Sequence, residues 1–261
     1  MAEYNNLLVR KEGRVAVLTL NRPEKMNTFN RDVWREIVQA TDEIEQMDDL
    51  GAVVVNGNGQ HFSAGIDLNH LQTGATSQMV MKNLPWEQAM YNKLEDFPVP
   101  VIAAVHGLCL GSGTELILAC DIRIAANNAR FAIPEVRFGL SPDMGGTTRL
   151  PRLVGPGQAK RLILGCEEID AQEAKAIGLV EIIVEPEQLM ERAMKLAQRI
   201  ANSPPVGVWM AKKGINLAAE SSRTAGQLFE QAQSVFCCGT EDQKEAVKAF
   251  FEKRRPVFKG K

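Results

Sequence analysis

The residues of this sequence best suited to chemistry are carboxylates, and the first of them is Glu115. It stands directly before an apolar run, Leu116-Ile-Leu-Ala-Cys, in a segment that should be buried. Removing a carboxylate from water is costly unless it is paired, and burial raises its pKa towards neutrality. A group that titrates near neutral pH suits general acid–base catalysis. The alternative is a glutamate at the start of a helix, with its charge satisfied by first-turn amides.

Two further acids lie downstream. Glu135 follows Pro134, and Asp143 lies eight residues later in the segment Leu140-Ser-Pro-Asp-Met-Gly-Gly. Each residue on its own is typical of a turn or of the protein surface. The three acids are therefore candidate proton-transfer groups, but by themselves they do not define a reaction.

Two glycine-bearing segments each follow an apolar run: Phe62-Ser-Ala-Gly-Ile-Asp-Leu and Leu110-Gly-Ser-Gly-Thr-Glu-Leu. Glycine lets the backbone turn sharply and lets a ligand approach free N–H groups. The second segment also opens a helix, whose first N–H groups lack internal partners and favour negative charge. Two such donors aimed at one point would form an oxyanion hole. Ordinary strand-to-helix turns would explain the same glycines.

Spacing excludes two other glycine motifs. A dinucleotide fingerprint needs a third glycine where Leu116 stands. A serine nucleophile elbow needs glycines two residues to each side of Ser112, where Leu110 and Thr114 stand. The spacing of the histidines gives no support for a metal site.

Apolar segments that alternate with helical segments must position these residues. Hydrophobic periodicity predicts strands and helices along the whole chain. The predicted strands are 7–11, 14–20, 51–56, 101–105, 122–125, 130–132 and 180–184, and the predicted helices are 30–47, 114–120, 157–164, 171–176, 187–202, 205–219, 221–237 and 241–253. Such alternation is typical of an α/β fold with parallel strands covered on both faces.

Two segments have a special place in this plan. Residues 69–95 are polar and methionine-rich, with a helical stretch near 84–95, and we predict a mobile loop over a site there. Ser203-Pro-Pro interrupts the pattern and divides the chain into a core of residues 1–203 and a helical region of residues 204–261.

Composition limits the class of protein. The chain has 261 residues, of which 45% are apolar and 24% charged, and a net charge of −2. These values predict a folded core and no nucleic-acid or membrane partner. Five cysteines without a Cys-x-x-Cys pair indicate a reducing compartment. We therefore expect a cytoplasmic protein, or a mitochondrial matrix protein if a transit peptide has been removed.

Ordered motifs along nearly the whole chain resemble the crotonase (enoyl-CoA hydratase/isomerase) superfamily. They are Leu20-Asn-Arg-Pro with Asn27, His61-Phe-Ser-Ala-Gly-Ile-Asp-Leu, Ala103-Ala-Val-His-Gly, Gly111-Ser-Gly-Thr-Glu-Leu, Ala119-Cys-Asp-Ile-Arg-Ile-Ala, Phe131-Ala-Ile-Pro-Glu, Gly145-Gly-Thr-Thr-Arg-Leu, Ala171-Gln-Glu-Ala-Lys-Ala-Ile-Gly-Leu-Val and Ala249-Phe-Phe-Glu-Lys-Arg. The resemblance implies a ββα spiral core and a helical C-terminal region that carries trimer contacts. A homotrimer or a hexamer of two trimers is the implied assembly.

The resemblance also implies roles for individual residues. The backbone N–H groups of Ile66 and Ser112 match the pair that binds the thioester oxygen, although Ser112 replaces the more usual glycine. The implied coenzyme A contacts fall into two groups, one near the N-terminus and one on the C-terminal helix that often acts across a subunit boundary. They are Lys25, Met26, Ala64 and Asp67 in the first group, and Phe250 and Lys253 in the second.

The implied activity is hydration of a 2-enoyl-CoA, with Glu115 and Glu135 holding the water. The substrate is then a coenzyme A thioester, and no permanently bound cofactor or metal is expected. Asp143 stands where hydratases usually have glycine, which leaves open a dienoyl- or enoyl-CoA isomerase that uses Glu135 and Asp143. An acyl-CoA hydrolase fits less well, because such relatives usually lack an acid at the position of Glu115. A non-catalytic RNA-binding or scaffolding relative is the remaining alternative.

Overall fold

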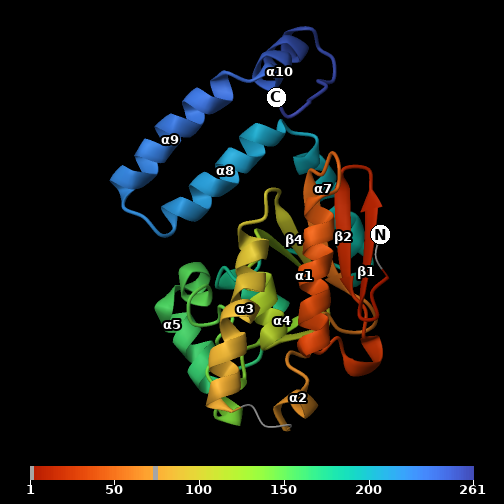
Figure 1. Ribbon diagram of the computed structural model, residues 1–261, viewed down its shortest axis with the longest axis vertical. Coiled ribbons are helices and arrows are strands. Elements are labelled where there is room, and N and C mark those ends of the chain that lie inside the picture. The colour runs from red at the N-terminus through yellow and green to blue at the C-terminus, as the bar shows by residue number, and fades with distance from the viewer. Residues whose placement is uncertain (1–2, 73–75) are drawn as a thin grey trace.

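The computed structural model describes residues 3–72 and 76–261, and its centre is a six-stranded sheet (Figure 1). The strand order is β1-β2-β3-β4-β6-β9. Only β1 and β2 pair antiparallel, and the remaining neighbours pair parallel. The strands are β1 (Leu7–Glu12), β2 (Val15–Leu20), β3 (Ala52–Gly57), β4 (Val101–Val105), β6 (Ile122–Ala126) and β9 (Ile182–Val184). The parallel pairing that the apolar strands predicted is confirmed.

A second sheet of three short strands lies beside the first and holds the glycine segments. Its order is β5 (Leu108–Leu110), β7 (Arg130–Ala132) and β8 (Ile169–Asp170). The segment around Ser63 joins it, because Ser63 N–H donates to Leu108 O and Leu110 N–H donates to Ser63 O. The sequence did not predict β5, which is only three residues long and lies between Gly107 and Gly111.

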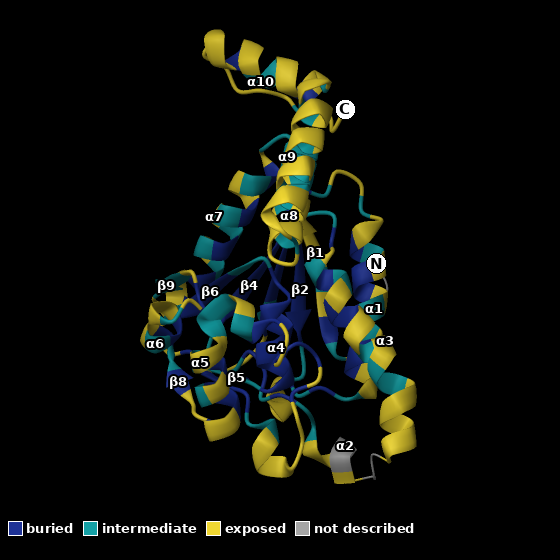
Figure 2. Ribbon diagram, turned by 90° about the vertical axis from the view of Figure 1, so that its left-hand side faces the viewer, coloured by how far each residue is buried: buried dark blue, intermediate teal, exposed yellow. Residues whose placement is uncertain are grey.

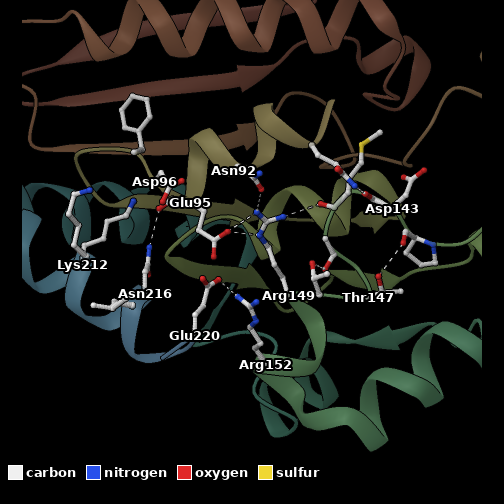
Figure 3. A pocket seen from close by; sticks show the side chains of 18 of the residues that line it. Asn92, Glu95, Asp96, Asp143, Thr147, Arg149, Arg152, Lys212, Asn216 and Glu220 are labelled. Carbon is white, nitrogen blue, oxygen red and sulfur yellow. Dashed lines mark hydrogen bonds and ion pairs between the residues drawn. The ribbon is translucent and has the colours of Figure 1, made fainter. Parts of the chain in front are cut away.

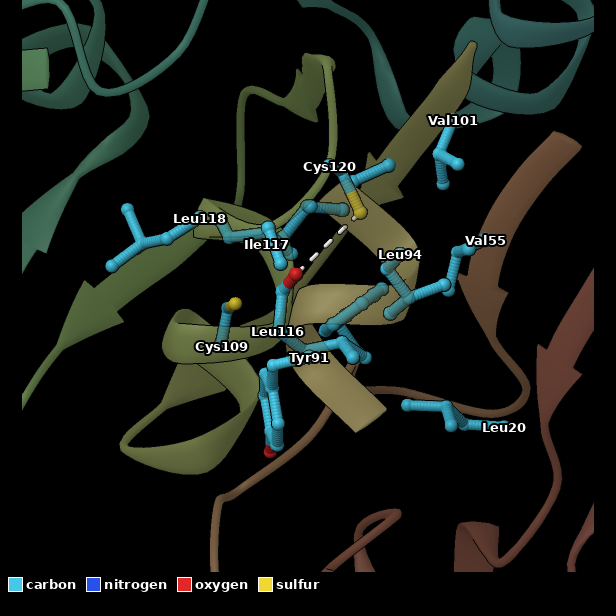
Figure 4. Close-up of a cluster of buried hydrophobic side chains, with 14 of the residues drawn as sticks. Leu20, Val55, Tyr91, Leu94, Val101, Cys109, Leu116, Ile117, Leu118 and Cys120 are labelled. Carbon is cyan, nitrogen blue, oxygen red and sulfur yellow. Dashed lines mark hydrogen bonds between the residues drawn. The ribbon is translucent and has the colours of Figure 1, made fainter. Parts of the chain in front are cut away.

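Helices cover both faces of the large sheet, as the burial colours of Figure 2 show. One face packs against α1 (Arg31–Glu45), α3 (Ser77–Glu95) and α4 (Ser112–Leu118), and this is the larger core. Figure 4 shows part of it around Tyr91 and Leu116. The other face packs against α7 (Leu189–Ala201). Asn30 caps α1 by accepting hydrogen bonds from two first-turn amides.

The helical stretch predicted near 84–95 is confirmed, but the loop predicted before it is wrong where the structure describes it. Residues 73–75 lie outside the described residues, and the short helix α2 (Leu68–Gln72) precedes them. After them, the Thr76 side chain caps α3, which continues to Glu95 despite Pro85 in its interior. Polar residues and a proline mask the helical periodicity, and the buried face of Met90, Tyr91 and Leu94 fixes the helix by packing.

The C-terminal half is helical, as predicted, with one earlier start. Helix α5 begins at Leu150 instead of residue 157, because the chain bends at Gly155, with φ 78°, and continues helically on both sides. The helices after the spiral core are α8 (Pro205–Ala218), α9 (Arg223–Cys238) and α10 (Glu241–Phe251), with α5 (Leu150–Gly165) and α6 (Ala171–Ala176) before α7. In Figure 1, α8 and α9 extend away from the sheet and lead to α10. A domain boundary at residue 203 stays a prediction.

One buried ion pair fastens α8 to the core. Lys212 Nζ lies 2.8 Å from Asp121 Oδ2, and the same oxygen accepts the Val101 N–H at 2.7 Å. Asp121 follows α4 closely, so this contact ties the C-terminal helices to the end of the helix that carries Glu115.

Candidate active site

Glu115 is held in a fixed orientation inside the protein. It lies in the first turn of α4, all of whose residues are buried, and its own exposed fraction is 1%. Its Oε1 accepts the backbone N–H groups of Met144 at 3.0 Å and of Gly146 at 2.9 Å. These amides belong to the segment that follows Asp143, so the glycine-rich sequence there serves as the cradle of the carboxylate.

Glu135 approaches the same turn from another element. It begins the short helix η2 (Glu135–Phe138), and hydrogen bonds from Gly111 N–H to Ala132 O bring the two segments together. A Cβ atom built on Gly111 would lie 2.6 Å from Glu135 Oε1, so the carboxylate rests against the glycine. Its buried Oε2 has no hydrogen-bond partner among the described residues. Such an orphaned acceptor next to Glu115 is suited to hold a water molecule or a substrate atom.

The carboxyl groups of the site have raised pKa values, so they can exchange protons near neutral pH. Burial raises the pKa of Glu115 to about 7, and the charges of Glu135 and Asp143 add to the rise. Burial also raises the pKa of Glu135 to about 7, with Asp143 adding to it. The pKa of Asp143, the most exposed of the three, is raised by partial loss of hydration. The structure therefore brings all three acids into one interacting group, and perturbed pKa values of this kind are common at functional sites.

Replacing Glu115 with glutamine should stabilise the protein at alkaline pH. The pKa of Glu115 is raised from 4.5 to about 7 on folding, so the folded state binds the proton more tightly and loses stability as pH rises through this interval. Glutamine keeps the acceptor for Met144 and Gly146 and removes the buried charge. We expect a gain of about 1–3 kcal/mol in unfolding free energy at pH above 7. Urea unfolding at a series of pH values measures it.

The gain should vanish at pH below 4.5, where wild-type Glu115 is protonated in both states. Glu191, an exposed acid on α7, supplies the matched control, Glu191→Gln, which should change little at any pH. A Glu115→Gln protein that is less stable than wild type at pH 8 would contradict this account of the buried charge.

The two candidate oxyanion donors lie on adjoining turns. Ser63 and Cys109 form a bridge, and a Cβ atom on Gly65 would meet Leu110 O at 2.8 Å, so the backbones approach as closely as glycine allows. Around Ile66, Phe29 N–H donates to Gly65 O and Asp67 N–H donates to Phe29 O, which leaves the Ile66 N–H outside this pattern.

Ser112 fits the turn in place of glycine. It is the first residue of α4, and the positive φ of the turn, 49°, falls on Gly111 before it. The N–H of a first helical residue has no partner within its helix. Ser112 is not among the residues with a positive φ, so its side chain fits this backbone, and its N–H remains a candidate donor.

The residues assigned to coenzyme A divide into two places. Lys25 ends the short helix η1 (Pro23–Lys25). The carbonyl oxygen of the next residue, Met26, accepts the Ala64 N–H at 2.9 Å. The Asp67 carboxylate lies 3.6 Å from the Arg22 guanidinium. These four predicted contacts therefore share one region beside Gly65. Phe250 and Lys253 lie on and after α10, which Figure 1 places at the far end of the molecule from α2. Within one chain they do not join the site.

Sequence reasoning missed the contribution of α3. Tyr91 is fully buried, and its hydroxyl donates to Ser112 O at 3.3 Å. Gln88 Nε2 donates to the Asp143 carbonyl oxygen at 2.7 Å, and Arg149 joins the segment after Asp143 to Asn92 at 2.6 Å (Figure 3). Tyr91 and Leu94 lie in the helical stretch predicted near 84–95, but their spacing was not connected to the site.

A cavity of about 890 Å³ adjoins the acids without containing all of them. Its lining comes from α3, the 142–152 segment and α8, and Figure 3 shows Asp143 at one end and Lys212 at the other. Glu115 and Glu135 are not part of the lining, so we locate the chemistry at the turns of Gly65 and Gly111 and not in this cavity. Among the described residues, no cluster of His, Cys, Asp or Glu has a metal-binding arrangement, and no helix is long and apolar enough to cross a membrane.

Comparison with known proteins agrees with this geometry. Residues 10–261 match the family model described as enoyl-CoA hydratase/isomerase. The chain is 42% identical to a short-chain-enoyl-CoA hydratase of Clostridium acetobutylicum over 97% of both chains, and 39% identical to a crotonyl-CoA hydratase of Syntrophomonas wolfei over 98% of both. It superposes on the crystal structure of an enoyl-CoA hydratase from Bacillus anthracis with a TM-score of 0.94 and 36% identity, covering 98% of this chain and 100% of that one.

The chain therefore belongs to the enoyl-CoA hydratase/isomerase family and has the crotonase fold, as the motifs predicted. It is an enzyme of that family, and the comparison confirms the family and the fold class. The roles of individual residues stay predictions that rest on the geometry above.

Proposed function

We propose that this protein is an enoyl-CoA hydratase that adds water across the 2,3 double bond of an acyl-CoA thioester. The observation that carries the proposal is the pairing of Glu115 and Glu135, two carboxyl groups from different elements whose pKa values both rise to about 7 beside the turn of Gly111. Two such groups can hold one proton between them at neutral pH, one acting as base and the other as acid. The relatives named above carry hydratase names.

The thioester carbonyl oxygen accepts the N–H groups of Ile66 and Ser112. Glu115 takes a proton from the bound water as its oxygen attacks the β-carbon, and the electrons of the double bond move to the carbonyl oxygen as an enolate. Glu135, in its protonated form, then delivers its proton to the α-carbon. The two amides stabilise the enolate, and one such donor is typically worth about 2.7–4 kcal/mol of barrier. Proton exchange with solvent restores the starting state.

A panel of acyl-CoA thioesters tests the proposal. Loss of enoyl-thioester absorbance together with a mass gain of one water identifies a hydratase. An unchanged mass with altered retention identifies an isomerase, and release of free coenzyme A identifies a hydrolase. Absence of any absorbance loss across several chain lengths would overturn the proposal.

Asp143 supports a second candidate, double-bond isomerisation by Glu135 and Asp143. The specific observation is that Asp143 lies close enough to raise the pKa of both Glu115 and Glu135. In this reading, one of the pair removes a proton at one end of a diene and the other returns one at the far end. Glu115 would then act only through its charge.

Asp143→Asn separates these two candidates. For a hydratase we expect the hydration rate of Asp143→Asn to stay within about tenfold of wild type. Removal of a residue that acts as a general acid or base typically lowers the rate by more than tenfold. Removing the charge of Asp143 lowers the pKa of Glu135. The alkaline limb of the kcat/KM profile, where Glu135 loses its proton, should therefore move to lower pH. A pH series of initial rates measures it.

Asp48→Asn, at an exposed acid, is the control for this series and should leave the profile in place. Loss of turnover in Asp143→Asn as large as in Glu115→Gln would favour the isomerase instead. An unmoved alkaline limb would contradict the electrostatic link from Asp143 to Glu135.

We further propose a homotrimer or a hexamer of two trimers. Large apolar side chains on α8 to α10 are exposed in the single chain, which is unusual for a monomer (Figure 2). They are Ile215, Leu228, Val235, Phe236, Val247, Phe250 and Phe251. Another copy that covers them would also supply Phe250 and Lys253 to the coenzyme A site. Light scattering coupled to size exclusion tests this, and a monomer at all concentrations would overturn it.

We also propose a cytoplasmic location and a division of the chain into a core of residues 1–203 and a helical region of residues 204–261.

A further inference from the structure

A fourth carboxylate, Glu87, lies next to the three in the site. It stands on α3 directly before Gln88, whose side chain donates to the Asp143 carbonyl oxygen at 2.7 Å, and one turn before Tyr91, whose hydroxyl donates to Ser112 O at 3.3 Å. Positions four residues apart share one face of a helix. Glu87 therefore shares the face that Tyr91 directs towards α4, beside Asp143.

The electrostatics agree with this placement. Glu87 is half-buried, and its pKa is raised first by burial and then by the charge of Asp143. The pKa of Tyr91 is raised by burial and by Glu115, Asp143 and Glu87. The charges of all three carboxylates therefore act on the Tyr91 hydroxyl.

Among the residues that the structure describes, the nearby cations do not neutralise this group. Arg31, from the start of α1, acts on Glu87 but is exposed, and it is the last of the influences on its pKa. Arg149, on the same segment as Asp143, is already paired with Glu95 at 2.6 Å (Figure 3). The side of the site that Asp143 and Glu87 share is therefore negative.

The positions of the oxyanion donors and of Glu115 indicate where the acyl chain of a bound substrate lies relative to Asp143 and Glu87. With the thioester oxygen at the amides of Ile66 and Ser112 and the reacting carbons at Glu115, an acyl chain that continues past Glu115 meets the cradle of that carboxylate. The cradle begins at Met144, directly after Asp143. This step rests on the hydratase proposed above.

We propose that Glu87 and Asp143 form an acidic end of the acyl pocket that selects uncharged 2-enoyl chains and rejects acyl groups ending in a carboxylate. Two like charges within a few ångströms in a partly desolvated site repel strongly. Rejection of a competing ligand by an unpaired like charge is a common source of specificity. Glu87 is then a specificity-determining residue, distinct from the acids that move protons.

The test compares two six-carbon substrates that differ only at the end of the chain: 2-hexenoyl-CoA and the 2,3-unsaturated thioester of adipic acid. In wild type, kcat/KM for the second should be lower. Glu87→Gln should raise the ratio of the second to the first by at least about tenfold. Glu191→Gln, on the opposite face of the sheet, should leave the ratio unchanged. A ratio that changes less than twofold in Glu87→Gln would overturn the proposal.

A binding measurement on the wild-type protein keeps the proposal independent of the variant. Adipyl-CoA should compete at least about tenfold more weakly than hexanoyl-CoA, and the gap should narrow as salt is added. Equal competition by the two saturated thioesters overturns the proposal even if Glu87→Gln fails to fold. Failure of the hydratase proposal appears differently, as absence of 2-hexenoyl-CoA hydration in wild type.

Discussion

Replacing Glu135 with glutamine is expected to lower kcat for 2-enoyl-CoA hydration by about a hundred- to ten-thousand-fold, with a much smaller change in KM. Glutamine has nearly the same shape, so the carboxylate's place against Gly111 is kept, but it has no proton to deliver to the α-carbon. Initial rates from the loss of enoyl-thioester absorbance measure the effect. Glu115→Gln should cost a similar factor, and the double variant little more, because the two residues act as one unit.

Hydrogen exchange distinguishes the two acids. In heavy water, wild type should exchange deuterium into the α-carbon of a saturated thioester such as butyryl-CoA, a reaction that needs the group that handles the α-proton. Glu135→Gln should abolish this exchange, whereas Glu115→Gln should retain it, because Glu115 serves the water. Exchange that survives in Glu135→Gln and disappears in Glu115→Gln would reverse the two roles. Glu191→Gln is the control for folding and for non-specific effects of the substitution.

The sequence predicted Glu115 well because its signal is local. A carboxylate next to an apolar helical run must be buried, and the structure gives it 1% exposure. Its meeting with Glu135 is not local. That contact depends on the pairing of β5 with β7, where Leu110 is opposite Ala132, which sets Gly111 beside the start of η2. Strands of three residues are too short to show a hydrophobic periodicity. Only the family resemblance therefore predicted that Glu115 and Glu135 share one site.

Helix α3 shows the opposite case, in which tertiary packing overrides weak local signals. The polar residues before Leu84 predicted irregular structure, yet the Thr76 cap begins a helix that continues to Glu95. The helical stretch predicted near 84–95 is confirmed, but nothing in the sequence connected Glu87 to the site. The candidate proton-transfer residues were thus named from sequence, and the residue that we infer to select the acyl chain was found only from packing.

The largest effect of a single methyl group is expected at Gly111. Gly111→Ala should reduce kcat by at least about a hundred- to a thousand-fold, the typical cost of losing one oxyanion donor. Its φ of 49° is a conformation that L residues rarely adopt, and the new Cβ would lie 2.6 Å from Glu135 Oε1 and 3.9 Å from Gly65 Cα. Either the turn that presents Ser112 N–H or the Glu135 carboxylate must shift. Steady-state hydration rates measure the loss.

Gly13→Ala separates this local effect from backbone strain. Gly13 has a similar φ, 60°, in the turn between β1 and β2, but a Cβ there meets nothing within 4 Å. Both variants should therefore lose stability, because each places an alanine at a positive φ, while only Gly111→Ala loses turnover. Equal activity in the two variants would show that the backbone at Gly111 has room to relax, and the N–H of Ser112 would then lose its place as the second oxyanion donor. A loss confined to Gly111→Ala ties the enolate to this turn, because both variants place an alanine at a positive φ and differ in what the added methyl group touches.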